Sequence, residues 1–335
     1  MSIRLVANPC SFCALRVAGL NLTLSRFVAS TLVLGASLLS AGKTQAEPLG
    51  PASDYNVFIL GDDNQSNTDA RGRVAVGGTA NFSSYSVAVD LPTNTPNALV
   101  VGGDVNFTNG TVNGQLHYGG SSNVSNATIT GGAPIHDQPI DFTAAANSLS
   151  SLSSSLSQLT ANGTVTDNYG LTLKGTDANL DVFNLTTTQL SQANHYNLNI
   201  VVPVGATVLI NVDGSTGANL GLESFAMKLN GSDMSNSDGS KVLLNLSSNV
   251  TSLNMNSLAF FGSILAPETN ITASNGNING TLIGASLNGT IEAHNVTFTG
   301  NLPAVAVPEP SSVALLGLSA LGCGVLIRRQ GRRAA

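Results

Sequence analysis

The feature that most constrains this chain is a succession of short β-branched runs, each ended by Gly-Gly or Asn-Gly. Residues 74–78, 99–103 and 127–132 share this form. An apolar run of three to five residues has the length of a short strand, and glycine and asparagine tolerate the positive φ of tight turns. The chain is therefore expected to be mainly β, with many short strands and tight corners.

Some of these runs repeat. The segments GGTANFS (residues 77–83) and GGDVNFT (residues 102–108) form an imperfect repeat of 25 residues, and a second array of short strands fills residues 263–300. The repeats predict a right-handed β-solenoid with coils of about 20–25 residues. A β-sandwich also has short strands and frequent turns, and it stays open, above all for residues 171–250.

One segment has a helical period instead. Its apolar residues recur at steps of three and four, and they predict one long amphipathic α-helix with a serine-rich outer face: Phe142, Ala145, Leu149, Leu152, Leu156 and Leu159. Asp141 is the expected N-cap, and Asn162 with Gly163 is expected to end the helix. Serine is a mediocre helix former, so the leucines must dock on another surface. That surface is expected to be the side of the solenoid, with a dimer seam as the alternative.

The first 46 residues predict a secretory signal peptide. Arginines precede the apolar residues 27–41, and small residues offer a cleavage site between Ala46 and Glu47. The apolar stretch of 15 residues is shorter than the roughly 20 that a transmembrane helix needs. We therefore expect residues 1–46 to be removed on export.

The C-terminal residues 308–335 mirror this arrangement. Pro308, Glu309 and Pro310 precede the apolar residues 313–327, and Arg328 and Arg329 begin an arginine cluster. This order resembles the PEP-CTERM sorting signal of Gram-negative bacteria that make exopolysaccharide. The resemblance implies a precursor held transiently in the inner membrane, cleavage by an exosortase-type protease and delivery to the cell surface. A plain membrane anchor is the alternative, and in either case a short apolar helix is expected at each end of the body.

The body, residues 47–307, resembles the choice-of-anchor A domain over roughly residues 49–302. The segments that carry the resemblance are residues 54–62, 71–78, 203–212, 262–267 and 277–283. Such domains occur on bacterial surface proteins with various C-terminal anchors. The resemblance implies a surface role and supplies no catalytic residue.

Charge and cysteine content exclude several classes of function for this body. Residues 47–307 hold five basic and 18 acidic side chains, so nothing could neutralise a run of phosphates and no nucleic-acid partner is expected. All three cysteines, Cys10, Cys13 and Cys323, lie outside the body, which therefore has no disulfide. The Cys-x-x-Cys beside the export signal is interpreted as coincidence.

The usual catalytic motifs are missing from the sequence. It contains no His-Glu-x-x-His, no Gly-x-Ser-x-Gly and no phosphate-binding loop. Glu292 and His294 alternate on one expected strand face and form the one candidate acid–base pair. They are interpreted instead as a solvated pair near the last coil. We expect no enzyme activity.

Two acidic clusters are candidate calcium ligands. Asp62, Asp63 and Asp69 fall in one polar stretch, and Asp177 and Asp181 alternate on an expected strand. Carboxylate oxygens are the ligands that Ca²⁺ prefers, although no EF-hand pattern is met. No other cofactor is expected.

Two threonine pairs and many Asn-x-Ser/Thr triplets complete the candidates. Thr128 with Thr130, and Thr297 with Thr299, are each two residues apart. Flat threonine ladders on solenoids can bind ice or sugar chains, whereas the triplets are interpreted as chance in a composition rich in asparagine and serine.

The leading hypothesis is a secreted, non-enzymatic structural or adhesive protein of an exopolysaccharide or biofilm matrix. A polysaccharide- or ice-binding module is the first alternative, and a β-helical carbohydrate-active enzyme is the second.

Overall fold

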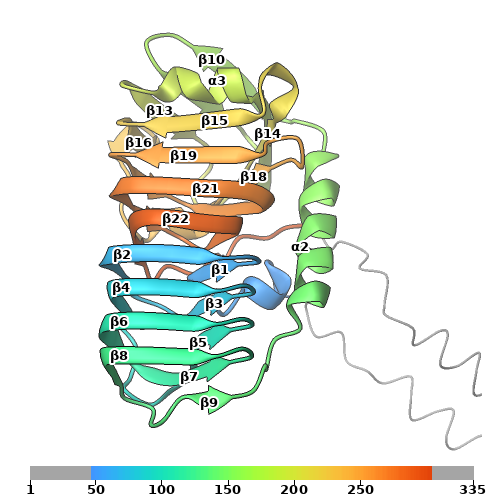
Figure 1. Cartoon of the computed structure of the whole chain (residues 1–335). Helices are drawn as coiled ribbons and strands as arrows, with labels where there is room; N and C mark the ends of the chain where they lie inside the picture. Colours follow the sequence, from blue (N-terminus) through green and yellow to red (C-terminus); the bar gives the residue numbers. More distant parts are fainter. Residues whose placement is uncertain (1–46, 304–335) are drawn as a thin grey trace, which may run out of the picture. The chain divides into compact units, whose positions relative to one another are not determined.

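The computed structural model describes residues 47–303, and they wind into a β-solenoid of parallel coils (Figure 1). Two walls run along it. We call one the open wall (β2, β4, β6, β8, β15, β19 and the later parts of β21 and β22). The other is the helix wall (β1, β3, β5, β7, β9, β12, β14, β18 and the first parts of β21 and β22). Parallel pairing throughout both walls replaces the β-sandwich alternative.

The N-terminal stack holds the first nine strands, which alternate between the walls: β1 (Val57–Ile59), β2 (Asp63–Ala70), β3 (Val74–Val76), β4 (Ala80–Val87), β5 (Thr95–Val101), β6 (Val105–Val112), β7 (Gly114–Tyr118), β8 (Ser122–Ile129) and β9 (Ile135–His136). Equivalent positions of β2 and β4 are 17 residues apart, and those of β4 and β6 are 25 apart. The predicted pairing of residues 77–83 with 102–108 is confirmed. The predicted coil length is wrong, because the basic coil has 17 residues and a surface loop, residues 88–94, lengthens one of them.

Helix α2 (Phe142–Ser157) carries the chain back along the helix wall (Figure 1). Asp141 caps it as expected, since its Oδ1 accepts a hydrogen bond from the Ala144 N–H at 2.9 Å. The helix ends at Ser157 with Gln158 as C-cap, so the expected stop at Asn162 and Gly163 is wrong. Phe142, Ala145, Leu149 and Leu156 are buried, and they pack with Phe58 and Leu243 of the helix wall in a core separate from the lumen.

A ladder of asparagines also docks α2. Asn245 Nδ2 donates to the backbone oxygen of Ser153 at 3.0 Å, and Asn211 Nδ2 donates to that of Leu156 at 2.8 Å. The ladder is linked internally, because Asn245 Nδ2 also donates to Asn211 Oδ1 at 2.9 Å. Ser153 is buried and donates to the Leu246 carbonyl at 3.0 Å. The sequence predicted that the serine side of the helix faces outward. The buried Ser153 shows that part of this side faces the solenoid instead.

The C-terminal stack begins at the far end of the solenoid and winds back toward the first coil. Its wall elements are β12 (Leu180–Thr186), α3 (Thr187–Leu190), β14 (Thr207–Asp213), β15 (Asn219–Glu223), β18 (Val242–Leu246), β19 (Ser252–Asn256), β20 (Ala259–Phe261), β21 (Ser263–Asn279) and β22 (Leu282–His294). A second sheet forms a third wall from β10 (Thr164–Asp167), β11 (Leu171–Lys174), β13 (Asn197–Val201), β16 (Ala226–Leu229) and β17 (Ser232–Asp233). Coils here reach 34 residues and shorten to 16–18 near β22. Four short 3-10 helices, η1 (Gly50–Ala52), η2 (Ser191–Ala193), η3 (Gly214–Thr216) and η4 (Asp238–Lys241), lie among these described elements.

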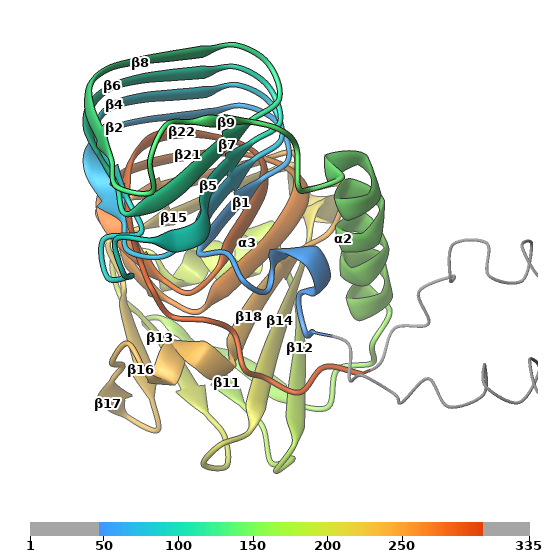
Figure 2. The same cartoon turned by 90° about the horizontal axis from the view of Figure 1, so that it is seen from below.

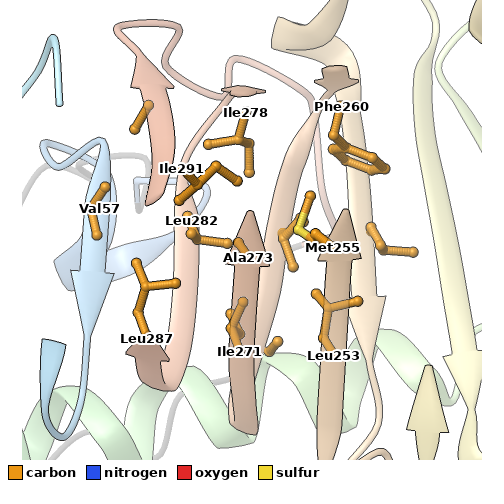
Figure 3. Close-up of a cluster of buried hydrophobic side chains, with 14 of the residues drawn as sticks. Val57, Leu253, Met255, Phe260, Ile271, Ala273, Ile278, Leu282, Leu287 and Ile291 are labelled. Atoms are coloured by element: carbon orange, nitrogen blue, oxygen red, sulfur yellow. The ribbon is translucent and has the colours of Figure 1, made fainter. Parts of the chain in front are cut away.

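The two stacks meet at a seam formed by β22, which pairs with β21 on one side and with β1 and β2 on the other. The last coil of the chain thus lies against the first. One lumen core crosses the seam, as Figure 3 shows for Val57, Leu282 and Leu287 beside the side chains of β19 and β21. The seam fuses the two stacks into one solenoid.

The ends of the chain lie outside this description. The predicted cleavage residue Ala46, the sorting residues Pro308, Glu309 and Pro310, and the two expected terminal helices fall outside residues 47–303; Glu47 is exposed at the start of the described part. Among the helices within residues 47–303, none combines the length and the apolar character that a membrane crossing requires.

Candidate binding face

Outward side chains of the open wall lie in rows, because its strands are parallel and in register. In four successive coils the same outward position holds asparagine: Asn64, Asn81, Asn106 and Asn123. Beyond the seam the same row continues through Asn288 on β22, Thr272 on β21 and Asn254 on β19. We call these seven residues the asparagine row.

Hydrogen bonds between the amides order this row. Asn81 Nδ2 donates to Asn64 Oδ1 at 2.7 Å, and Asn106 Nδ2 donates to Asn81 Oδ1 at 2.9 Å. Each amide has two N–H donors and a carbonyl with two lone pairs, so a linked amide keeps a donor and an acceptor for a ligand. Because neighbouring strands are about 4.8 Å apart, the row offers both groups at that interval.

A hydroxyl row runs beside it, two residues further along each strand: Ser66, Ser83, Thr108 and Ser125. Side chains two residues apart on a strand share a face, so the two rows form one polar surface. The hydroxyls of Thr108 and Ser125 are 3.2 Å apart and share a hydrogen bond. Strands β4, β6 and β8 carry no charged side chain at all.

A bulge follows the hydroxyl row at the same place in each coil. The residues there have φ between 50° and 56°: Asn67, Ser84, Asn109 and Asn126. Short polar side chains adopt this left-handed conformation more readily than branched ones, because they bond locally to the backbone. Since each of these four coils has the bulge, their rows stay in register on both sides of it, whereas the pairing of β2 with β22 shifts register after Gln65.

These rows explain the Asn-x-Ser/Thr triplets, and their interpretation as chance was wrong. In Asn81-Phe82-Ser83, for example, the asparagine enters the asparagine row, the serine enters the hydroxyl row and Phe82 points into the core. The signal was available in the sequence, since the triplets of β2, β4, β6 and β8 recur at the coil spacings of 17 and 25 residues.

Of the two threonine pairs, only Thr128 lies on a strand of the open wall. Thr128 is aligned with Thr111 on β6 and joins a third, shorter outward row with it. Thr130 lies just past β8, where its hydroxyl donates to the Thr93 carbonyl. Thr297 and Thr299 lie after β22 in a segment without strand structure, so their expected place on a strand face is wrong.

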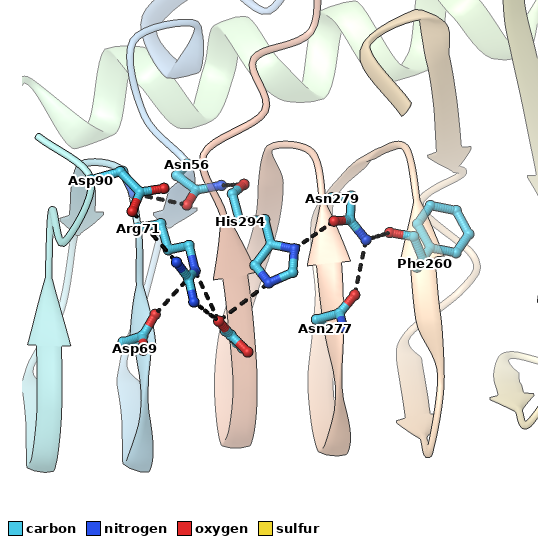
Figure 4. Close-up of polar contacts among 10 residues, drawn as sticks. Asn56, Asp69, Arg71, Asp90, Phe260, Asn277, Asn279 and His294 are labelled. Carbon is cyan, nitrogen blue, oxygen red and sulfur yellow. Dashed lines mark hydrogen bonds and ion pairs between the residues drawn. The ribbon is translucent and has the colours of Figure 1, made fainter. Parts of the chain in front are cut away.

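Glu292 and His294 lie at the seam (Figure 4). Arg71 donates to Glu292 Oε1 through Nη2 at 2.7 Å and Nε at 2.9 Å, and His294 Nε2 is 3.2 Å from the same oxygen. Burial raises the pKa of Glu292, but the Arg71 hydrogen bond and the charges of His294 and Arg71 outweigh it, and the net pKa is lowered. The interpretation as a solvated edge pair is wrong, because β22 is an interior strand and this network links the stacks.

The first calcium candidates point in different directions. Asp62 is exposed and accepts the Thr79 N–H at 2.7 Å, whereas Asp63 is fully buried in the lumen. Both carboxylate oxygens of Asp63 lack a hydrogen-bond partner, and burial raises its pKa well above the ordinary value. Asp69 faces Arg71, with Oδ1 3.9 Å from Nε.

The second pair of candidates holds a turn. Asp177 accepts the Asn179 N–H at 2.8 Å, and Asp181 accepts the Asp177 N–H at 3.0 Å. Within residues 47–303 no three histidine, cysteine, aspartate or glutamate side chains gather closely enough to hold a metal ion. The structure thus directs the first three acids to different places and uses the oxygens of Asp177 and Asp181 as hydrogen-bond acceptors within one turn.

Comparison with protein families bears on this face. Residues 48–295 match the ice-binding-like adhesive domain, and residues 306–333 match the PEP-CTERM protein-sorting motif. The chain belongs to the ice-binding-like adhesive domain family. In this chain the domain is followed by the sorting motif.

Solved structures and curated proteins add the following. An ice-binding protein from the Antarctic ascomycete Antarctomyces psychrotrophicus is 16% identical, with 76% of this chain and 98% of that chain covered and a TM-score of 0.32. Ice-binding protein 1 of Shewanella frigidimarina is 12% identical, with 77% and 98% covered and a TM-score of 0.34. Among curated proteins, none matches this chain.

Proposed function

We propose that this protein is an exported, non-enzymatic adhesin that binds a hydroxyl-rich polymer of the extracellular matrix through its open wall. The observation that carries the proposal is the asparagine row, in which amides repeat in register from coil to coil and hydrogen bonds link Asn64, Asn81 and Asn106. A side chain in an ordered row loses little further entropy on binding. Such a row suits a ligand that is itself periodic.

The chemistry of the wall favours hydroxyl groups as the ligand. An amide both donates and accepts, as a hydroxyl does, so a row of amides pairs with a polysaccharide without any charge. The absence of charge from β4, β6 and β8 speaks against a strongly ionic ligand at this part of the wall. Many weak contacts along one polymer then add up through multivalency.

Ice is the second candidate ligand. The family description names ice-binding-like domains, and a flat, regular array of donors and acceptors suits a crystalline surface of water as well as a polymer. In the row, asparagine takes most of the positions and threonine one. Ice and polysaccharide therefore stay separate outcomes of one test.

The test compares two lysine variants in both assays. Asn81→Lys together with Asn106→Lys interrupts the row with charge, and Thr166→Lys on the exposed β10 of the second sheet is the matched control. We expect the double variant to lose binding to insoluble polysaccharide by about tenfold or more, and the control to keep it. Loss of ice-recrystallisation inhibition alone would assign ice, and unchanged binding in both assays would refute the open wall as the site.

The surroundings of the described acids support a non-enzymatic role. A groove of about 260 Å³ beside α2 is lined mainly by serines, with Glu268 as its acid. Glycoside hydrolysis ordinarily needs two carboxylates facing one bond. Glu292, the other candidate, is bound by Arg71 and keeps a lowered pKa, which does not suit a general acid.

Export and processing complete the proposal. The PEP-CTERM motif supports cleavage by an exosortase near Pro308, from a precursor held in the inner membrane of a Gram-negative cell, and Ala46 is the proposed signal cleavage site. The family that residues 48–295 match is the ice-binding-like adhesive domain and not specifically choice-of-anchor A, and for residues 47–307 we propose right-handed coils, as nearly all parallel crossovers have. Intact-mass measurement of surface protein should find a chain that ends near residue 308. A chain running to Ala335 would refute the sorting proposal.

A further inference from the structure

The two ends of the solenoid are built differently. At the end formed by the C-terminal stack, Asn194 occupies the free edge of β15. Its Nδ2 donates to the Gly221 carbonyl at 2.9 Å, and its Oδ1 accepts the Glu223 N–H at 2.9 Å. One amide side chain thus replaces the backbone of a further strand. The 3-10 helix η2 lies against β15 here and buries Ala193.

The helix wall is closed at this end by the same device. Asn162 Nδ2 donates to the Leu180 carbonyl at 2.9 Å, and Asn162 Oδ1 accepts the Val182 N–H at 2.7 Å. Both outermost strands, β12 and β15, therefore have their edge groups paired by an asparagine. An exposed strand edge invites pairing with another chain, and these two asparagines prevent it.

At the opposite end β8 is the outermost strand of the open wall (Figure 2), and no asparagine side chain among residues 47–303 pairs its free edge. There β8 pairs with β6 on one side, and no hydrogen bond from residues 47–303 reaches the backbone of its other edge. Along this edge, N–H and C=O groups of alternate residues point away from β6. The sequence of β8, SNVSNATI, contains no charge and no proline, which are the usual devices that protect an edge.

The lumen is also less closed at this end. Val124 and Ile129 of β8 are only partly buried, whereas Phe107 and Val112, their partners on β6, are fully buried. Beyond them, β9 consists of two exposed residues, and Ile135 is 36% exposed. Both the edge and the core therefore stop here without a covering element among the described residues.

We propose that a second copy of this chain covers this end, with β8 of one copy paired antiparallel to β8 of the other about a two-fold axis. A strand edge is self-complementary, since its alternating donors and acceptors match those of an identical strand turned around. The uncharged β8 brings no like charges together. The capped end cannot take this role, because Asn194 and Asn162 already fill its edges.

The pairing would join two open walls into one surface. In an antiparallel pair centred on Val124, Asn123 of one copy would lie opposite Ser125 of the other, so the ends of the asparagine and hydroxyl rows would meet across the axis. A face of twice the length would bind a periodic ligand with greater avidity. This consequence rests on the proposed function, whereas the pairing itself does not.

Cysteine cross-linking tests the pairing in the full chain. The three native cysteines, Cys10, Cys13 and Cys323, are replaced by serine, and single cysteines are introduced by Asn123→Cys or Ser125→Cys. Matched controls are Asn254→Cys in the middle of the same wall and Asn219→Cys at the capped end, both equally exposed. We expect mild oxidation to give covalent dimers from the two β8 variants and not from the controls.

A second measurement needs no cysteine. Asn123→Lys with Ser125→Lys puts like charges on both sides of the axis, and sedimentation should show self-association weakened by about tenfold or more. Asn254→Lys should leave it unchanged, and circular dichroism checks that each variant folds. A monomeric native protein without cross-links would overturn the proposal, as would equal cross-linking of the controls or cross-links only to a different protein. Polysaccharide binding without dimers would overturn the pairing and leave the proposed function standing.

Discussion

The N-terminal and C-terminal stacks build the same two walls by different means. Coils of the N-terminal stack are 17 residues long apart from one inserted loop, and stacked aromatic rings fill its lumen; Phe82 lies 4.6 Å from Tyr85 and 5.8 Å from Phe107, centroid to centroid. Coils of the C-terminal stack reach 34 residues, have a third wall and are bound to α2 by the Asn211 and Asn245 amides.

This difference indicates how each stack is held. The C-terminal stack, called the thick stack below, has its own support, because α2 contacts β14, β18 and β21. The N-terminal stack, called the thin stack, pairs with the rest of the solenoid through β1 and β2 on β22, and no element among residues 47–303 covers its other end. We infer that the thin stack depends on the seam as its template, while the thick stack depends on its helix. The four predictions below test that division.

The largest effect is expected at the glycine of the seam. Gly289 on β22 has φ +146°, and a Cβ there would lie 1.8 Å from the Ala273 carbonyl oxygen. Gly289→Ala should therefore lower the free energy of unfolding by about 3 kcal/mol or more. Hydrogen exchange should show loss of protection in both stacks, because the template strand itself is distorted.

Two further glycines sharpen this result. Gly110 in the thin stack has the same 1.8 Å approach, to the Tyr85 carbonyl, so Gly110→Ala should be as costly but should loosen the thin stack alone. Gly132 has φ +102° and open space around it, so Gly132→Ala should cost only about 1 kcal/mol. Equal loss of protection everywhere in both Gly289→Ala and Gly110→Ala would show that the solenoid unfolds as one unit.

The next effect concerns the support of the thick stack. Asn245→Ala removes the donor to the Ser153 carbonyl and to Asn211 Oδ1 in a fully buried place. Buried groups left without a partner cost about 1–3 kcal/mol, so we expect a loss of about 2 kcal/mol in denaturant titration. Asn254→Ala on the exposed open wall, with no hydrogen bond to lose, should stay within about 0.5 kcal/mol. Similar losses in both variants would contradict the docking role of the ladder.

The same contrast decided what could be predicted from the sequence. In the thin stack Gly-Gly and Asn-x-Ser/Thr recur in the same order from coil to coil, at spacings of 17 and 25 residues, so its parallel pairing was predictable. In the thick stack the coil length changes from turn to turn, so no period appears and the third wall was not predicted. The helix was visible from its leucine spacing, because that periodicity is local.

The binding face was missed for a different reason. Each Asn-x-Ser/Thr triplet has no meaning by itself, and only the register between coils turns the asparagines into a row. Asn162 is a case in which a local pattern gave the wrong prediction. Asn-Gly after a helix usually marks its C-cap, so the sequence placed the end of α2 there. Here the helix has already ended, and Asn162 caps the edge of β12, which is 18 residues away from it in sequence at Leu180.

A smaller effect is expected from Asp63, a buried acid of the thin stack. Asp63 is fully buried without a partner, while its register neighbour on β22 is Leu287. Burial raises the pKa of Asp63 above its ordinary 3.8, so its contribution is most favourable below that pH and is lost as pH rises through the folded value. Asp63→Asn should therefore raise the free energy of unfolding at neutral pH by roughly 1 kcal/mol.

The pH profile separates this effect from simple repacking. The gain from Asp63→Asn should shrink as pH falls and level off only well below about 3.8, where the carboxyl is protonated in both the folded and the unfolded protein. Asp167→Asn on the exposed β10 is the surface control at neutral pH, where it should change the free energy of unfolding by less than about 0.5 kcal/mol. A constant gain at every pH would show that charge on Asp63 is not the cause.

The smallest effect is expected at the ion pair across the seam. The pKa of Glu292 is lowered from 4.5, since the hydrogen bond from Arg71 and the charges of His294 and Arg71 outweigh burial. Its contribution is thus present above about pH 4.5 and is lost as pH falls through the folded value. The Arg71 and Glu292 side chains are 38% and 32% exposed, so solvent screening limits the pair to below about 1 kcal/mol. Glu292→Gln should flatten the acid limb of the melting temperature between about pH 6 and pH 3, whereas Glu268→Gln on the exposed surface should leave it unchanged. If Glu292→Gln instead costs as much as Gly289→Ala at neutral pH, the seam is held by charge, and backbone pairing is not what joins the two stacks.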